Sequence, residues 1–171
     1  MRIIIKMINN SDLDVRYVQN TAIGAVLLWR FACSYYQTEN KPVPFLLFFL
    51  VLPLVFREDL CSQVQSTNKS SGLSKFCEKL FVQKKNDEVE SINNTSIKMR
   101  SLTIESFNIA VEANLLSLTP ENALVYPVFT KLDTSILHDE TIKLLSVAAK
   151  IGFWFSNLSL HEITKWLKVR F

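Results

Sequence analysis

Glycine is scarce in this chain of 171 residues, which contains only Gly24, Gly72 and Gly152. Glycine-rich phosphate-binding loops need several glycines close together, so both common kinds are excluded. The shortage also disfavours an all-β fold with many tight turns. Apolar residues make up 49% of the chain and charged residues 20%, so most of it can bury a core rather than stay disordered. The length fits one compact domain, and we expect a single one over residues 1–171.

Clustered catalytic or metal-binding groups are missing as well. Cys33, Cys61 and Cys77 lack the CxxC spacing of metal or redox sites, and reduced, partly buried thiols are the simple interpretation. His138 and His161 stand alone, and neither HExxH nor GxSxG occurs. Acidic residues occur as adjacent pairs, which cannot converge on one face of a helix. We therefore expect no enzymatic activity, no cofactor and no metal site.

The charge is small but unevenly distributed. Nineteen basic and 16 acidic residues give a net charge of +3, which is too low to indicate a nucleic-acid binder. From residue 143 to the end, Glu162 is the one acidic residue. The basic residues of this region are Lys143, Lys150, Lys165, Lys168 and Arg170. The C-terminal part is therefore basic.

The most apolar segment covers residues 45–56, with the sequence FLLFFLVLPLVF. It has 12 residues, whereas a membrane-spanning helix needs about 20. Lys41 and Arg57 lie close to its ends, and Pro53 would break its last turns. This favours a core helix buried on all sides that ends before Pro53, with a membrane-dipping segment as the alternative. No secretion signal is visible, and we expect a cytoplasmic protein.

The hydrophobic periodicity predicts a mainly α fold with a small β-hairpin. We expect a helical core over residues 12–82, including a central helix from about 13 to 36. A polar connector is expected over residues 83–100, followed by a helix–hairpin–helix part over residues 101–171. Within the core, a short amphipathic helix is expected to bury Leu73, Phe76, Cys77 and Leu80.

The second half is predicted to contain a helix that starts near Thr103, with a hairpin after it. The buried stripe of this helix is predicted to be Ile104, Phe107, Val111 and Leu115. Alternating residues on both sides of the turn at 120–122 predict the hairpin. Helix followed by hairpin is the order of a winged helix, so a winged-helix-like second half that binds DNA stays open. Glu105 and Glu112 on the wet face of the helix would repel phosphate.

A long helix over residues 139–155 carries two large aromatic side chains in an unusual place. Its exposed stripe is predicted to contain Lys143 and Lys150, with Phe153 and Trp154 one helical step further along. Either the final helix folds back over the aromatics, or they anchor a partner protein, because desolvated aromatics dominate interface energies. The final helix is predicted to start with a capping box formed by Ser159 and Glu162.

The order of several segments carries a family resemblance. A helix containing Trp29-Arg30-Phe31 and Tyr35-Tyr36 precedes the FLVLP run, and the run Ala149-Lys150-Ile151-Gly152-Phe153-Trp154-Phe155 follows much later, before Val169-Arg170. Over residues 18–171 this order resembles the middle components of bacterial three-component ABC-ATPase systems. These are Lamassu-like defence systems against phages and plasmids. Family members usually carry arginine where Phe153 stands and glycine where Lys168 stands.

The resemblance implies a non-catalytic adaptor that joins a coiled-coil, SMC-like ABC ATPase to an effector, often a nuclease. It implies contact with DNA only through the complex, and no membrane. The expected partner-binding residues are Lys143, Lys150, Phe153, Trp154, Lys165, Lys168 and Arg170. A DNA-binding winged-helix regulator and a peripheral membrane protein that uses residues 45–56 are the alternatives.

Overall fold

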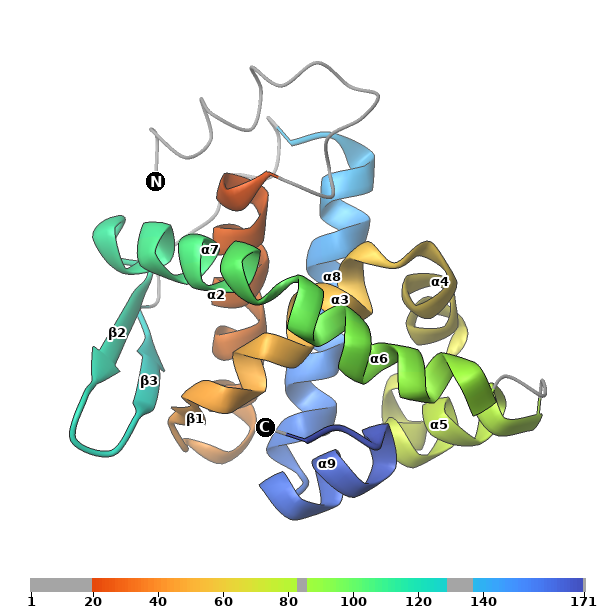
Figure 1. Ribbon diagram of the computed structural model, residues 1–171. Helices are drawn as coiled ribbons and strands as arrows, with labels where there is room; N and C mark the ends of the chain where they lie inside the picture. The colour runs from red at the N-terminus through yellow and green to blue at the C-terminus, as the bar shows by residue number, and fades with distance from the viewer. Residues whose placement is uncertain (1–19, 83–85, 129–136, 171) are drawn as a thin grey trace.

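The computed structural model describes residues 20–82, 86–128 and 137–170, and these residues are mainly helical with a small antiparallel sheet (Figure 1). The predicted fold class is confirmed. Buried apolar residues from both halves of the chain join in one continuous core cluster.

Helix α2 (Thr21–Glu39) lies at the centre of this core. The Asn20 side chain caps its start by accepting hydrogen bonds from the backbone N–H groups of Ala22 and Ile23, at 3.0 and 3.2 Å. Its end is marked by Asn40 in the left-handed conformation. Helices α7 (Arg100–Glu112) and α8 (Asp139–Ser156) pack most extensively against it. Most residues of α2 are therefore buried.

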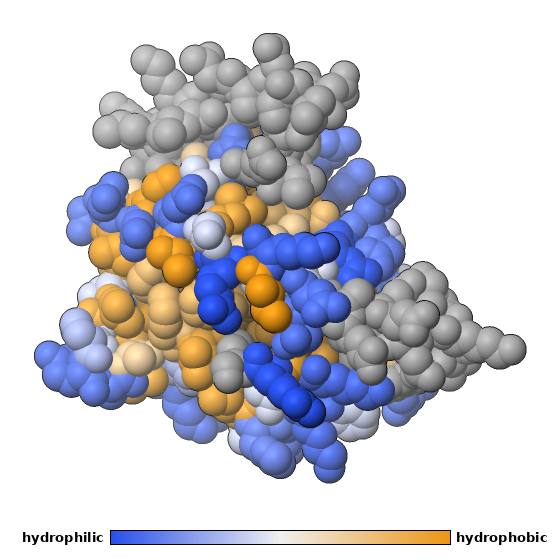
Figure 2. Space-filling model, viewed as in Figure 1, coloured by the Kyte–Doolittle hydropathy of each residue, from blue (hydrophilic) through white to orange (hydrophobic). Residues whose placement is uncertain are grey.

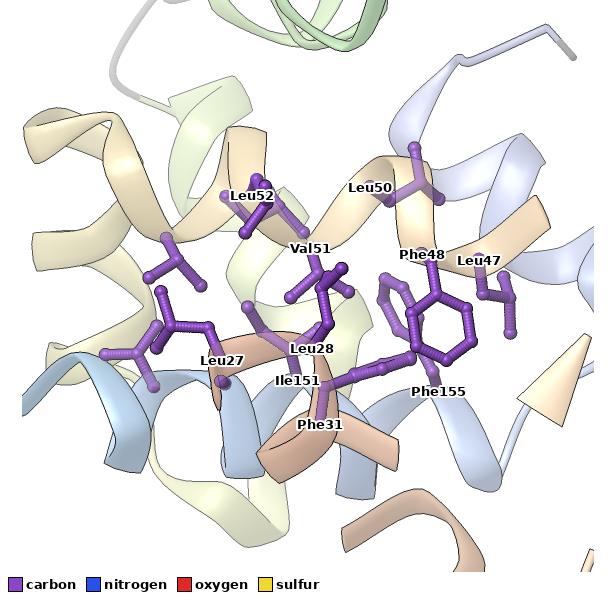
Figure 3. Packing of buried hydrophobic residues seen from close by; sticks show 14 of the residues in the cluster. Leu27, Leu28, Phe31, Leu47, Phe48, Leu50, Val51, Leu52, Ile151 and Phe155 are labelled. Carbon is purple, nitrogen blue, oxygen red and sulfur yellow. The ribbon is translucent and has the colours of Figure 1, made fainter. Parts of the chain in front are cut away.

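The apolar run at 45–56 forms the 3-10 turn η2 (Phe45–Leu47) and helix α3 (Phe48–Phe56). Residues 50–55 are all buried, and Figure 3 shows side chains of α3 meeting those of α2 and α8. The predicted core helix is confirmed, but its predicted end is wrong, because α3 continues through Pro53. The hydrogen bond that proline cannot donate costs free energy, and burial of the apolar helix outweighs that cost. Among the described residues no helix is long and apolar enough to cross a membrane.

Helix α4 (Glu58–Ser66), the 3-10 turn η3 (Lys69–Ser71) and helix α5 (Gly72–Val82) follow α3. The four residues that α5 was predicted to bury are all buried. The stretch expected as a polar connector, residues 83–100, contains helix α6 (Asn86–Lys98), which packs against α3. Ile92 of α6 is completely buried. The buried Ile92 thus anchors a helix whose composition is mainly polar.

Helix α7 turns a different face to the core than its apolar periodicity predicts. It begins at Arg100 rather than near Thr103, and Ile104 and Val111 are 41% and 36% exposed. Its buried residues are Thr103, Ser106, Phe107 and Ala110. A Cβ atom added to Gly24 of α2 would lie 2.2 Å from the Ser106 Oγ. Small residues therefore bring α7 close to α2 and leave its branched apolar residues at the surface.

Strands β2 (Leu116–Thr119) and β3 (Leu124–Pro127) form the predicted hairpin. A third strand, β1 (Val43–Pro44), pairs with the other edge of β3, with Val43 opposite Val125. The two halves of the chain therefore share one sheet. Glu105 and Glu112 of α7 are exposed, as expected.

Helix α9 (Leu160–Leu167) begins with the predicted capping box. The Ser159 Oγ accepts a hydrogen bond from the Glu162 N–H at 3.2 Å, and the Ser159 N–H donates to the Glu162 carboxylate at 2.8 Å. The helix ends at Lys168, which is left-handed with φ 50°. Val169 is buried, and the Arg170 N–H donates to Asn93 Oδ1 of α6 at 3.1 Å. Residues 169 and 170 are thus docked on α6.

Candidate functional site

The residues predicted to form one partner-binding stripe lie in separate places. Lys143 is exposed on α8 and borders a hollow of about 490 Å³ between α8 and the α3–α4 segment. Glu58 and Glu140 border the same hollow. A lysine beside two carboxylates gives this hollow mixed charge, so Lys143 does not extend a basic surface.

Lys150 is turned inward and holds the end of α4. Its Nζ donates hydrogen bonds to the carbonyl oxygens of Val64, Gln65 and Thr67, at 3.0, 3.0 and 2.9 Å. The last carbonyls of a helix lack partners within the helix, and a lysine ammonium can supply them. Burial, and then the positive charge of the nearby Lys79, lower the pKa of Lys150. Lys150 is therefore a structural residue that joins α8 to α4.

Trp154 is buried, and Phe153 is half-buried beside it. The Trp154 Nε1 donates a hydrogen bond to the Lys69 carbonyl oxygen at 2.8 Å, and its ring packs against Phe76 with centroids 6.0 Å apart. The Lys69 ammonium lies 4.3 Å from the centroid of the Phe153 ring, a cation–π contact. Trp154 is thus covered by η3 and α5, whereas the final helix was the expected cover. Phe153 and Trp154 border a hollow of about 380 Å³, which Trp166 of α9 also lines. We call it the aromatic hollow.

The remaining predicted residues lie on or after α9. Lys165 and Lys168 are exposed. Arg170 is also exposed and borders a groove of about 280 Å³ where α3, α6 and the end of the chain meet. Arg100 borders the same groove, and we call it the arginine groove. Its apolar lining consists of Leu46, Phe49, Leu50, Ile97 and Val169.

Leu46 and Ile97 are surface residues that the sequence did not predict. They are 40% and 54% exposed. Leu46 belongs to a run in which nearly every residue is apolar, so nothing in the sequence separates it from its buried neighbours. Ile97 lies in the stretch expected to be a connector. Figure 2 shows apolar surface beside strongly hydrophilic side chains in the region where α6, α7 and the end of the chain meet.

Metal-binding side chains do not cluster in groups of three or more among the described residues. All three cysteines are buried and free, as expected of reduced thiols. Burial raises the pKa of Cys33 and of Cys77 to about 12. Since the thiolate is the reactive form, neither thiol is a nucleophile near neutral pH.

Most of the run at 149–155 that carries the family resemblance serves packing. Lys150 caps α4, and Trp154 bonds to the Lys69 carbonyl. A Cβ atom added to Gly152 would lie 2.4 Å from the Phe31 carbonyl oxygen, so glycine allows α8 to approach α2. Phe155 is fully buried and packs edge-on against Phe31, with centroids 5.9 Å apart.

The fold and its hollows define a mainly helical protein in which apolar surface is bordered by basic side chains. A family model matches residues 8–171, that of the ABC-three component (ABC-3C) system Middle Component 3. The chain belongs to this family, and the expected resemblance to middle components of ABC three-component systems is confirmed. No curated protein and no solved structure shows significant similarity to the chain.

Proposed function

We propose that the chain is a non-catalytic adaptor that joins an SMC-like ABC ATPase to an effector in a cytoplasmic, Lamassu-like defence complex against phages and plasmids. The observation that carries the proposal is the family match over residues 8–171, because a middle component of a three-component system has two other components to join. Exposed apolar side chains beside basic ones support it, since such surfaces are suited to protein partners.

The partner-binding role expected from the sequence is proposed for the residues that remain accessible. These are Lys143, Phe153, Lys165, Lys168 and Arg170. Lys150 and Trp154 support this surface from inside, because their polar atoms are bonded to backbone carbonyls of 64–69. Their substitution would disturb partner binding indirectly, through the fold.

A tagged pull-down from the native host, with mass spectrometry of the captured proteins, tests the adaptor role. We expect recovery of a coiled-coil ABC ATPase together with an effector subunit. Recovery of the chain alone would overturn the proposal. A gel-shift assay of the purified chain on duplex DNA over a range of salt concentrations would then test the DNA-binding alternative, because phosphate contacts give salt-sensitive affinity.

Phe153→Asp tests the aromatic hollow as a partner contact. Phe153 is half-buried, and a carboxylate there would face the Lys69 ammonium, so we expect the fold to survive and partner capture to be lost. Tyr126→Asp is the matched control, since Tyr126 is an aromatic residue that is 40% exposed on β3. Circular dichroism checks that both variants fold. A folded Phe153→Asp variant that still captures its partners would place the interface elsewhere.

A further inference from the structure

We infer that the arginine groove binds a partner segment whose apolar side chains are flanked by carboxylates. The inference rests on the adaptor function proposed above and specifies one of its contact surfaces and the chemistry of the partner. The groove is separate from the aromatic hollow, with which it shares no lining residue.

The apolar part of the groove combines accessible side chains with a fixed floor. Ile97 and Leu46 are the accessible residues, at 54% and 40% exposure, whereas Leu50 is completely buried. The wall formed by the end of the chain is held in place, because Val169 is buried and the Arg170 N–H is bonded to Asn93. A surface that is already ordered loses little conformational entropy when a partner binds. The volume of about 280 Å³ lies just below the range of small-molecule pockets, about 300–1,000 Å³, and suits a few inserted side chains.

The charge at the rim of the groove sets the chemistry of the partner. Arg100 and Arg170 border the groove, and no acidic residue lines it. Neither arginine forms an ion pair with any residue in the described ranges. Arginine binds carboxylates through two parallel hydrogen bonds, which makes it well suited to acidic groups at an interface. An apolar segment that carries carboxylates on its flanks would therefore satisfy the floor and the rim together.

A nucleic acid is the weaker match. Its phosphates could meet the two arginines, but most of the lining is formed by leucine, isoleucine, valine and phenylalanine side chains, which offer no hydrogen bond to a sugar or a base edge. The polar side chains of the lining are Asn93, whose Oδ1 already accepts from the Arg170 N–H, and Ser96, whose hydroxyl donates to the Ile92 carbonyl oxygen. An apolar segment that carries carboxylates matches both the apolar lining and the two arginines. The experiment below would also detect DNA if DNA were the occupant.

Two pairs of variants test the groove in the assembled complex. Ile97→Asp is expected to weaken capture of one partner subunit at least about tenfold, as for an apolar contact buried at an interface. Ile104→Asp, on α7 outside the groove lining, is the control for a similarly exposed isoleucine and should leave capture unchanged. Arg100→Glu is expected to raise the Kd about tenfold at low salt, with the difference shrinking as salt rises. Lys98→Glu makes the same charge change at an exposed residue outside the groove lining and should have little effect.

A photo-crosslinking amino acid at position 97 then identifies the occupant. The expected product joins this position to a peptide of another subunit that contains Leu, Ile or Phe next to Asp or Glu. A crosslink to DNA, to a second copy of the chain, or to a partner peptide without acidic residues would overturn the inference. The inference would also be overturned if the Ile97→Asp and Arg100→Glu variants captured the partner as strongly as the wild-type chain does. If the wild-type chain captures no subunit, the adaptor function itself has failed, which separates that result from a failure of the groove.

Discussion

Lys150 should be a stability residue, and Lys150→Met tests this directly. Methionine keeps most of the aliphatic stem but removes the ammonium that binds the carbonyls of Val64, Gln65 and Thr67. The bond to Gln65 is exposed, so water can replace it, whereas the bonds to Val64 and Thr67 are partly buried. The Val64 oxygen also accepts from the Thr67 N–H at 3.3 Å, so the loss should come mainly from the Thr67 carbonyl.

The magnitude follows from these contacts. An acceptor left without its partner costs about 1–3 kcal/mol when buried, so the partly buried Thr67 carbonyl accounts for a loss of about 2 kcal/mol. We expect Lys150→Met to lower the free energy of unfolding by about 2 kcal/mol, and Tm by about 4–8 °C for a chain of this size.

The assay is urea unfolding followed by far-UV circular dichroism at neutral pH. Lys143→Met is the matched control, because it removes an exposed lysine from the same helix and changes the net charge equally. It should shift the free energy of unfolding by less than about 0.5 kcal/mol. Equal unfolding midpoints for the two variants would refute the structural role of Lys150.

Three further predictions concern helix ends and helix contacts. Lys168→Gly should raise the free energy of unfolding by about 0.5–1 kcal/mol, because Lys168 is left-handed and glycine adopts that conformation without strain. An unchanged or lower Tm in thermal unfolding would contradict this prediction. Gly152→Ala should lower Tm despite the higher helix propensity of alanine, because its Cβ would meet the Phe31 carbonyl oxygen at 2.4 Å; a stabilised variant would show that α8 can move away from α2. Hydrogen bonds from Ser159 lower the pKa of Glu162 below its ordinary value of 4.5, so its charge stabilises the fold at neutral pH, and this contribution is lost as the pH falls through the lowered pKa. Glu162→Gln should therefore lower Tm at neutral pH, and its difference from the wild type should disappear as the pH falls below the lowered pKa; a pH-independent difference would argue against a charge effect.

Two positions at which the resemblance implies a different residue have a structural account. Lys168, where the resemblance implies glycine, ends α9 with φ 50°, a conformation that glycine adopts more readily. Phe153, where the resemblance implies arginine, lies under the Lys69 ammonium. An arginine at position 153 would bring two positive charges together, so phenylalanine suits the lysine present in this chain.

The sequence alone determined features that depend on local periodicity and local hydrogen bonds. The mainly helical class, the buried face of α5, the hairpin at 116–127 and the Ser159–Glu162 capping box all follow from residues near one another in the chain. The buried character of most of the 45–56 run also followed, because the run is too short to span a membrane and too apolar to lie at the surface.

Tertiary structure alone decided which residues of α7 and α8 face the surface. The periodicity of α7 predicted Ile104 and Val111 as buried, but close contact between Gly24 and Ser106 turned a face of small residues toward α2. The predicted exposed stripe of α8 is only partly exposed for a similar reason. Lys150 and Trp154 turn inward, because they donate hydrogen bonds to backbone carbonyls within residues 64–69. A sequence does not show where distant carbonyls or small residues will lie, because these positions are set by how the helices pack.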